Sequence, residues 1–420
     1  MLMQLRFLGA CQEVGRSAIA VKTDRSRILM DYGVMINHEV VFPVHISPRD
    51  LDAVVLSHAH LDHSGLVPLF YVHSKLPVYG VEPTFKLTKV LVRDMIKLSG
   101  YYLPFEYIDL ESMMNHSVAV EYDSKFEVGD SEVTLVNAGH IPGSAQIILE
   151  SDGKRVLYTG DYNLVPTHLV TGAEKAYKGL DAIVIESTYA TEDHPDRIES
   201  ESSFVLACKQ VVEDGGTVLV PAFGVGRSQE IICMLADHNF SYPVYVDGMA
   251  LDAIRMLEEY PKSLRDEQRF KSAMRQAEQI TNWNKRRHAA RTAGVIVSPA
   301  GMLKGGASVF YMENIARDEK NGIFLVSYQV EGSPGRILLD EGRFTLRGKA
   351  RKVKARVEKF DFSSHGGKTQ LQETLREVDK TTRVFVIHGD ESNCARLADW
   401  ASHDLGLRTT TPRLGEAYDV

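Results

Sequence analysis

Cysteine and long apolar runs are scarce in this chain of 420 residues. Only four cysteines occur, and no two of them form the closely spaced pair typical of zinc ribbons or thioredoxin-like redox sites. We therefore expect free thiols, as in proteins of a reducing compartment. No stretch approaches the roughly 18 consecutive apolar residues of a membrane span, and the N-terminal segment lacks the apolar core of a signal peptide. These absences predict a soluble cytoplasmic protein with no membrane partner.

An excess of positive charge is also absent. Lysine and arginine together number 48 against 56 aspartates and glutamates, so the net charge is -8 and the whole molecule is no polycation built to coat nucleic acid. A nucleic-acid partner would need a local basic surface. Internal repeats, low-complexity tracts and long linkers are missing too. Because the length exceeds what one core usually holds, we expect two domains, or one domain interrupted by another.

The sequence does contain many short apolar runs rich in valine, isoleucine and leucine. They predict buried strands, for example at 53–58, 155–161 and 383–388. Six such runs stop at or just before a residue that can bind metal or move a proton: Asp31, His58, His140, Asp161, Glu186 and His388. Strand ends gather site residues at one edge of a sheet, so we expect these side chains to converge.

A different pattern fills the region from about 190 to 350. Helices are predicted at 202–214 and 228–238, the second opened by Ser228 as N-cap, and strands at 217–224, 294–301 and 322–329. These strands have no histidines at their ends. The alternation predicts a separate α/β domain inserted into the first.

The strongest local signal is His58-Ala59-His60-Leu61-Asp62-His63, directly after a predicted strand. Histidines two apart on an extended segment project to the same side, and Asp62 and His63 follow where the chain turns. Imidazole and carboxylate are ligands that zinc, manganese and iron prefer, unlike calcium and magnesium. The motif therefore predicts a transition-metal site rather than a solvated histidine-rich loop.

This segment resembles the H-x-H-x-D-H signature of the metallo-β-lactamase fold, whose other motifs match MDYG, AGHIPGSA and YTGDYN. The resemblance implies two zinc ions per chain, with manganese as the alternative metal. It assigns one ion to His58, His60 and His140, the other to Asp62, His63 and His388, and makes Asp161 the bridge between them. Asp31 would orient the ligands without binding metal.

The middle of the chain is similar to the β-CASP group, which contains RNase J and the nucleases of RNA 3′-end formation. The segments that carry this similarity include IESTYATEDH, PAFGVGRSQE and SYQVEGSPGR. The short archaeal homologues of the cleavage and polyadenylation specificity factor, without KH domains, match best. The resemblance implies an α/β fold, namely a metallo-β-lactamase αββα sandwich with an inserted α/β β-CASP domain. The expected bounds are 1–188 and 350–420 for the metallo-β-lactamase domain and 189–349 for the insertion.

The same resemblance implies a zinc-dependent ribonuclease that hydrolyses phosphodiester bonds of single-stranded RNA in RNA processing or decay. The implied catalytic residues are Asp31, Asp62, Glu186 and His365. His365 would give a proton to the leaving 3′ oxygen, and Glu186 would orient it. A histidine at position 388 accompanies RNA substrates in this group, which favours RNA over DNA. Endonuclease and 5′-to-3′ exonuclease activity both stay open.

Two basic clusters offer local surfaces for RNA despite the negative total charge. One lies within 262–291, and the other, at 343–359, holds eight lysines and arginines against one acidic residue. Either cluster can also be an ordinary solvated face. Glycine-rich turns add backbone N–H groups that suit phosphate. The RNA contacts expected are Arg227, Ser298, Gly301, Lys304, Lys349, Arg351, Lys352, Ser363 and Ser364.

Two other functions stay open on the same residues. A small-molecule hydrolase or a di-iron oxidoreductase uses the same fold and the same histidine motif, although neither needs a long insertion between Asp161 and His388. An RNA-binding subunit that has lost catalysis is the third interpretation, although every expected ligand position is filled. The chain is also compatible with a homodimer, to which the C-terminal segment would contribute.

Overall fold

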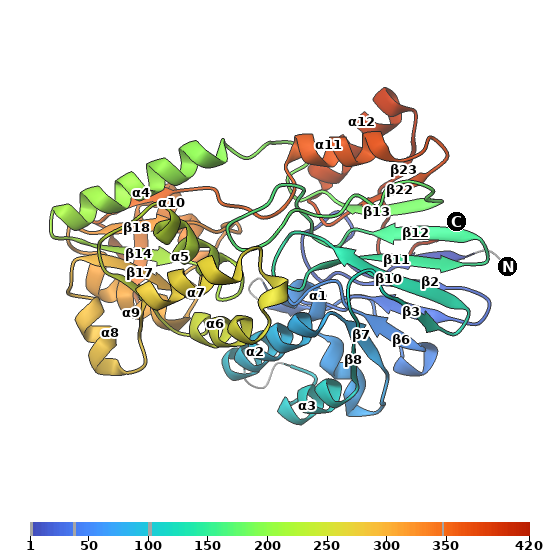
Figure 1. Ribbon diagram of the computed structural model, residues 1–420, viewed down its shortest axis with the longest axis horizontal. Coiled ribbons are helices and arrows are strands. Elements are labelled where there is room, and N and C mark those ends of the chain that lie inside the picture. Colours follow the sequence, from blue (N-terminus) through green and yellow to red (C-terminus); the bar gives the residue numbers. More distant parts are fainter. Residues whose placement is uncertain (1–2, 37–38, 100–102, 347) are drawn as a thin grey trace. The chain divides into compact units, whose positions relative to one another are not determined.

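The structure is a computed structural model that describes residues 3–36, 39–99, 103–346 and 348–420 (Figure 1). The chain forms two compact units. Unit 1 comprises 1–166, 171–193 and 364–420, and unit 2 comprises 167–170 and 194–363. The inserted domain expected from the sequence is therefore present as unit 2.

Unit 1 contains two seven-stranded sheets. In the first sheet the strand order is β24 (Ala417–Asp419), β1 (Gln4–Phe7), β2 (Ile19–Lys22), β3 (Arg27–Met30), β6 (Ala53–Val55), β7 (Val78–Gly80) and β8 (Ser117–Ala119). In the second it is β23 (Arg408–Thr410), β22 (Arg383–Ile387), β13 (Ala182–Glu186), β12 (Lys154–Tyr158), β11 (Ala145–Ser151), β10 (Ser131–Asn137) and β9 (Lys125–Val128). A small hairpin, β4 (Met35–Ile36) and β5 (Val40–Val41), and the short helices η1 (Pro48–Asp50) and η2 (Val67–Val72) complete the N-terminal part.

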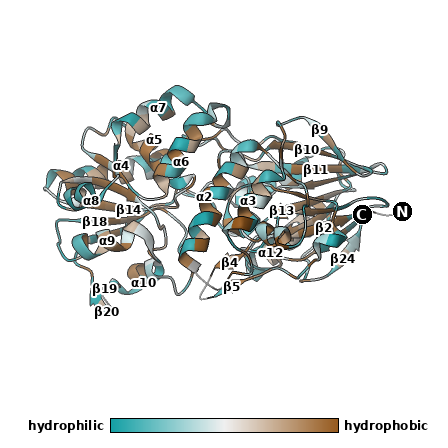
Figure 2. Ribbon diagram, turned by 90° about the horizontal axis from the view of Figure 1, so that it is seen from below, coloured by the Kyte–Doolittle hydropathy of each residue, from teal (hydrophilic) through white to brown (hydrophobic). Residues whose placement is uncertain are grey.

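Alternating apolar residues along these strands pack in two directions. One set, including Phe7, Ile28, Leu135 and Val184, forms a single core shared by both sheets. The opposite faces pack against helices. The first sheet is covered by α1 (Leu61–Ser64), α2 (Glu82–Ser99) and α3 (Tyr107–Asn115), and the second by α11 (Lys368–Glu377) and α12 (Glu391–Leu405). This layering confirms the expected αββα sandwich. Helix α2 carries both polar and apolar residues, as a helix with one buried face should (Figure 2).

Unit 2 is built on a six-stranded sheet in which every pair is parallel. Its strand order is β16 (Glu278–Gln279), β15 (Val244–Val246), β17 (Gly294–Ser298), β14 (Thr217–Pro221), β18 (Gly322–Leu325) and β21 (Arg356–Lys359). Its helices are α4 (Arg197–Glu213), α5 (Arg227–Asp237), α6 (Ala250–Glu259), α7 (Glu267–Gln276), α8 (Trp283–Ala289), α9 (Gly306–Ile315), α10 (Pro334–Glu341) and the short η4 (Pro261–Ser263). A hairpin of β19 (Arg343–Leu346) and β20 (Lys349–Lys352) is packed to this unit through Phe344 and Leu346.

The limits of unit 2 differ from the expected 189–349. The chain stays in unit 2 as far as residue 363, because β21 pairs with β18 and so belongs to the inserted sheet. The residue at the start of α5 also differs from the expectation. Gly226 is the N-cap, with a positive φ of 81°, and the Ser228 hydroxyl donates instead to the carbonyl of Phe223. Among the described residues, no helix combines the length and the apolar character needed to cross a membrane.

Candidate metal centre

Strand ends bring the chemically active residues of unit 1 together. Strands β10, β12, β13 and β22 run in the same direction in one sheet, and β3 and β6 run parallel in the other. Each is followed at its carboxyl end by one of the expected site residues, except that Glu186 is itself the last residue of β13. Two of these residues, Asp31 and His388, have positive φ values of 57° and 50°. Such strained backbone is typical of functional sites.

The first group of converging side chains consists of His58, His60, His140 and Asp161. One ligand atom from each lies within 4.8 Å of the others. Asp161 Oδ2 is 3.5 Å from His58 Nε2 and 3.7 Å from His140 Nε2, and His60 Nδ1 is 3.1 Å from His140 Nε2. Donors about 2.1 Å from a tetrahedral zinc lie about 3.4 Å apart. The observed spacings therefore fit one zinc-sized ion.

The second group consists of Asp62, His63, Asp161 and His388, again with one ligand atom of each within 4.8 Å of the others. His63 Nε2 is 3.3 Å from Asp161 Oδ1 and 4.0 Å from Asp62 Oδ2, and His388 Nε2 is 3.5 Å from Asp62 Oδ2. Asp161 thus offers one carboxylate oxygen to each group. This arrangement suits a carboxylate that bridges two cations.

Several polar atoms of the proposed ligands are buried without a hydrogen bond. Within the described part of the chain, His58 Nε2, His60 Nε2, His388 Nε2 and Asp161 Oδ1 make no hydrogen bond. Unpaired buried polar atoms are costly, and a bound cation would satisfy them. Burial and the neighbouring histidines hold the pKa of His58 and of His140 well below the ordinary value, so both imidazoles are neutral. Neutral imidazole is the form that binds metal.

The carboxylates of the centre, in contrast, are held in their charged form by neighbouring side chains. Burial opposes ionisation of Asp161, but His388, His63 and His365 lower its pKa well below the ordinary value. Burial opposes ionisation of Asp62 too, and His63 is foremost among the neighbours that lower its pKa. Both side chains are therefore anionic at neutral pH, as metal-binding carboxylates must be.

In four of the five proposed histidine ligands, His58, His63, His140 and His388, one ring nitrogen is held by a neighbour outside the ligand sets. Asp31 Oδ2 accepts from His63 Nδ1 at 2.7 Å, and from the hydroxyls of Ser57 and Tyr158 at 2.6 and 3.0 Å. Because Ser57 donates its only hydroxyl proton to Asp31, it accepts from His58 Nδ1, 3.1 Å away. Asp31 thus fixes the orientation of a ligand on each side of the centre.

Two further ligands are held from other segments. His140 Nδ1 donates to the backbone carbonyl of Ser364 at 2.9 Å, and the Thr188 hydroxyl lies 3.2 Å from His388 Nδ1. Ser57, Tyr158 and Thr188 were not singled out from the sequence. The only sequence feature that could have pointed to these three residues is their position next to the ends of strands that carry proposed ligands.

His365 and Glu186 form a separate pair beside the centre. Glu186 is fully buried, and its carboxylate oxygens lie 3.1 and 3.0 Å from His365 Nδ1. A carboxylate only accepts, so Nδ1 carries a proton and Nε2 faces the centre, 3.9 Å from Asp161 Oδ2. Burial opposes the charge, yet Glu186 and Asp161 raise the pKa of His365 to about 9. His365 is therefore placed and charged as a proton donor.

The residues expected to contact RNA are scattered over loops and one hairpin. Lys304, Lys349, Arg351 and Lys352 are exposed, and Arg227, Ser363 and Ser364 are partly buried. Ser298 departs from the expectation, because its side chain is fully buried and its hydroxyl donates to the carbonyl of Pro299. Gly301 is also buried. A Cβ atom at this position would lie 2.8 Å from Ser327 Oγ, so the position has no room for a side chain. Both residues shape a loop rather than present a side chain.

The two basic clusters differ in how their charges are used. In the first cluster Arg269, Lys271, Lys285 and Arg286 all form ion pairs with acidic residues of unit 2. In the second, Lys349–Lys352 is exposed at every residue and forms no recorded ion pair in the described structure. Arg347 of this cluster lies outside the described residues. The hairpin is therefore the cluster with charge available to a partner.

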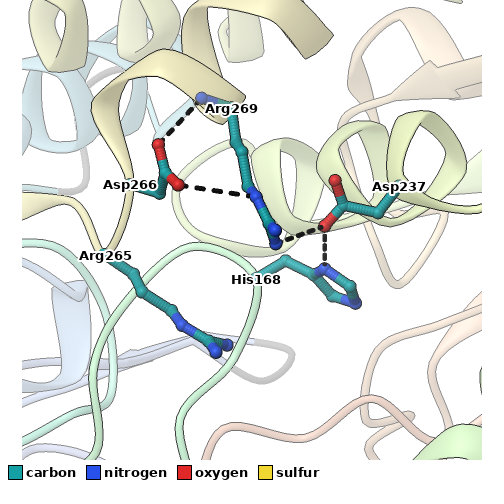
Figure 3. Close-up of a pocket in the computed structure, with 5 residues that line it drawn as sticks. All are labelled: His168, Asp237, Arg265, Asp266 and Arg269. Atoms are coloured by element: carbon teal, nitrogen blue, oxygen red, sulfur yellow. Dashed lines mark hydrogen bonds and ion pairs between the residues drawn. The ribbon is translucent and has the colours of Figure 1, made fainter.

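A charged pocket of about 220 Å³ lies in unit 2, apart from the metal ligands (Figure 3). It is lined by His168, Asp237, Arg265, Asp266 and Arg269. His168 Nδ1 is 2.7 Å from Asp237 Oδ2, and Nε2 is 2.9 Å from Glu201 Oε1. Because both nitrogens face carboxylates, both carry protons. No local sequence pattern indicates this ion-pair cluster, since its members are far apart in the chain.

Three family descriptions match the chain. "Metallo-beta-lactamase superfamily" matches residues 12–220, "Beta-Casp domain" matches 228–338, and "Zn-dependent metallo-hydrolase RNA specificity domain" matches 351–412. The three matches follow one another along almost the whole chain. They cover all the proposed metal ligands and most of unit 2.

Relatives of full length are also found. The chain is 40% identical to "RNase aCSPSF2" of Saccharolobus solfataricus, covering 99% of this chain and 85% of that protein. It is 37% identical to "Probable RNase MJ4" of Methanocaldococcus jannaschii, covering all of both, and 33% identical to "Transcription termination factor FttA" of the same organism, covering 72% of that protein. A crystal structure of a protein of unknown function from Enterococcus faecalis V583 has a TM-score of 0.60 over the full length of both chains at 14% identity, which shows a shared fold.

Proposed function

Because the chain belongs to the metallo-β-lactamase superfamily and carries its β-CASP domain, we propose that it is a metal-dependent ribonuclease that cleaves single-stranded RNA in RNA processing or decay. The names of two relatives that match over nearly its whole length, both ribonucleases, support this activity. The observation that carries the proposal is the pair of ligand groups joined by Asp161.

The metal we propose is zinc, two ions per chain, with manganese as the alternative. The imidazole-rich ligand sets and the donor spacings near 3.4 Å favour zinc. When bound, two such ions supply a water of lowered pKa and neutralise the phosphate oxygens during in-line displacement. The protein fixes the ligands in advance through Asp31, Ser57 and Thr188.

His365 is the proposed general acid. Its Nδ1 proton is bonded to Glu186, so the proton at Nε2 is the one that faces the centre. Transfer of that proton to the leaving 3′ oxygen yields a 3′ hydroxyl and a 5′ phosphate. Glu186 then stabilises the ring in the orientation needed for reprotonation. His365 and Glu186 thus serve the leaving group by supplying a proton, and the metal site serves the attacking water.

We propose that the β19–β20 hairpin binds the RNA backbone through Lys349, Arg351 and Lys352. Phe344 and Leu346 bury one side of the hairpin, which leaves the charged strand β20 in solvent. Phosphate attraction needs no specific geometry, so a row of unpaired cations is sufficient. The four cysteines are all buried free thiols, which fits the reducing cytoplasm as the compartment. A homodimer stays a prediction for light scattering to test.

A denaturing gel tests the proposed function. The protein, loaded with zinc, is incubated with a 5′-labelled single-stranded RNA beside the Asp62→Ala variant and the control Asp404→Ala, which alters an exposed residue of α12 in the same unit. We expect cleavage by the wild type and the control and none by Asp62→Ala. Intact RNA in the wild-type lane with metal bound would contradict the proposal.

The same gel distinguishes the two cleavage modes. Release of labelled mononucleotide from the start of the reaction indicates a 5′-to-3′ exonuclease. Discrete labelled fragments of intermediate length indicate an endonuclease. Both modes use the same residues at the metal centre, so neither outcome changes the assignment of the ligands.

A further inference from the structure

We propose that Phe223 and Tyr328, on adjacent loops of unit 2, form a stacking site for the bases of single-stranded RNA. The inference rests on the proposed function, because it names the part of the RNA that unit 2 recognises. It adds a contact with bases to the contacts with phosphate offered by the basic hairpin.

Exposed aromatic rings are rare in the described structure. Among the described aromatic residues, only Tyr107, Phe223, Trp283 and Tyr328 are exposed. Phe223 is 37% exposed and Tyr328 is 53% exposed, although most aromatic residues of this chain are buried. An isolated exposed ring needs no explanation, but two exposed rings on neighbouring loops of one sheet edge point to a common ligand.

The strand order places the two loops that carry these rings side by side. Phe223 follows β14 and Tyr328 follows β18, and these two strands pair directly in the parallel sheet. Both residues therefore lie in loops at the carboxyl edge of the sheet, and the strands that lead into these loops are roughly 4.8 Å apart. Ligands of parallel α/β sheets bind at this edge.

Gly301, on the loop after β17, fits between the two aromatic loops. A Cβ atom at this position would lie 3.2 Å from the backbone nitrogen of Phe223 and 2.8 Å from Ser327 Oγ, beside Tyr328. Three loop backbones thus approach closely at one point. Only a residue without a side chain allows that approach.

Buried hydrogen bonds hold these loops still. The Phe223 carbonyl accepts from both the backbone nitrogen and the hydroxyl of Ser228, at 3.0 and 2.7 Å. The buried Gln329 amide donates to the carbonyls of Gly301 and Ser327, at 3.0 and 2.8 Å. Anchored backbones present the rings at a small entropic cost, which favours binding.

The chemistry of the patch suits a nucleobase. An aromatic ring offers a flat apolar face, and every base has a matching π face, so stacking tolerates any sequence. Lys304 is exposed on the Gly301 loop and adds positive charge at the same edge. Flat apolar rings next to a cation are the combination found where proteins hold single-stranded nucleic acid.

The test measures binding of a short single-stranded RNA by fluorescence anisotropy, in the full-length Asp62→Ala protein so that the RNA stays intact. Phe223→Leu and Tyr328→Leu keep an apolar side chain but remove the ring. We expect each to weaken binding roughly 5- to 100-fold. Phe223→Trp and Tyr328→Phe keep a ring and should bind as tightly as the parent. Tyr107→Leu, on α3 of unit 1, removes an equally exposed ring and should have no effect.

An RNA with single abasic positions gives the second readout. In the parent, loss of the stacked base should weaken binding by a similar factor, and in the leucine variants the same abasic change should add little. Unchanged affinity of the leucine variants would overturn the proposal and leave the rings as a surface for a protein partner. The proposal would also be overturned if the leucine variants lost the same affinity for intact RNA as for abasic RNA. The rings would then affect binding through the conformation of the loops and not through contact with a base.

Failure of this inference is distinguishable from failure of the proposed function. If wild-type protein cuts RNA while the leucine variants bind it normally, only the stacking site is lost. If the wild type neither binds nor cuts RNA, the proposed function fails, and the stacking site fails with it.

Discussion

At the scale of single residues, the main feature of the centre is that hydrogen bonds orient most of its histidine rings. His63 is tied to Asp31, His58 to Ser57 and His140 to Ser364, so each ring is turned toward the same small volume. Orientation by a second partner typically accounts for 10- to 100-fold in metal affinity. The residues that do not touch metal therefore deserve their own tests.

Asp31→Asn should lower zinc affinity about 10- to 100-fold while the protein stays folded. Asparagine tolerates the positive φ of 57° at this position but loses the charge that faces His63 Nδ1. Zinc content after dialysis against a weak chelator measures the effect. The control Asp50→Asn alters an exposed carboxylate of unit 1 and should keep full metal content. Equal metal content in the two variants would contradict the role given to Asp31.

His365→Ala should slow single-turnover cleavage about 10²- to 10⁴-fold, because the leaving oxygen loses its proton donor. Zinc content should not change, since we assign His365 to a pair with Glu186 and to neither of the two proposed ligand sets. Glu186→Gln keeps a hydrogen-bonding partner for His365 Nδ1 and should cost less. An unchanged cleavage rate in His365→Ala would remove the proton-donor role.

Among single residues, the proposed ligands were indicated by two patterns: four of them, His58, His140, Asp161 and His388, stand at the end of an apolar run, and the other three follow in the H-x-H-x-D-H motif. The partners Ser57, Tyr158 and Thr188 could not, because serine, threonine and tyrosine beside a strand carry no distinctive pattern. Only the folded backbone shows that Tyr158, 127 positions from Asp31, donates to its carboxylate.

At the scale of elements, two parts of unit 2 invite measurement: the basic hairpin and the segment that contains His168. The hairpin was foreseen as a run of charge, but its pairing was not, because residues 343–352 lack an alternating apolar pattern strong enough to predict strands. Two of its helices, α4 and α5, and its central strands β14, β17 and β18 were foreseen, since their apolar periods are regular.

Replacing Lys349, Arg351 and Lys352 together by glutamine should weaken RNA binding and lower the slope of log affinity against log salt by about 2. The slope falls because about 0.7 counterion is released per phosphate contact on a single strand. The matched control replaces Arg269, Lys271 and Lys285, which are already ion-paired within unit 2. A slope that changes equally in both triple variants would contradict a specific role for the hairpin.

The ion-pair cluster around His168 should make the stability of unit 2 depend on pH. Burial opposes the charge, but hydrogen bonds to Glu201 raise the pKa of His168 above 6.5. Its contribution is therefore complete below pH 6.5 and is lost as pH rises through the raised pKa. Burial opposes ionisation of Glu201 as well, yet His168 and Arg197 lower its pKa to about 2, so its contribution holds above pH 4.5 and is lost toward pH 2.

Thermal unfolding of wild type and His168→Gln measures this effect. The difference in midpoint should be larger at pH 6 than at pH 9, because the wild type loses the charge of His168 in between. A replacement at the exposed His403 of α12 serves as the control and should show no such change. A difference that stays constant or grows with pH would contradict the assigned ion pairs.

At the scale of the whole molecule, the αββα sandwich and the inserted α/β unit could both be predicted, because the apolar runs and the motif order are regular. The limits of the insertion could not be set from the sequence. Residues 350–363 look like the return to the first domain, but β21 completes the inserted sheet beside β18. Pairing partners of a short parallel strand depend on tertiary contacts that no local pattern reveals.

For the whole molecule we propose that two metal ions, bound by residues at the strand ends of unit 1, make this chain a ribonuclease. The direct measurement removes all metal with a chelator, restores zinc in steps, and follows cleavage of single-stranded RNA at each step. We predict no cleavage without metal and a rise to a plateau at two zinc ions per chain. Cleavage by metal-free protein, or none at any zinc content, would contradict the account.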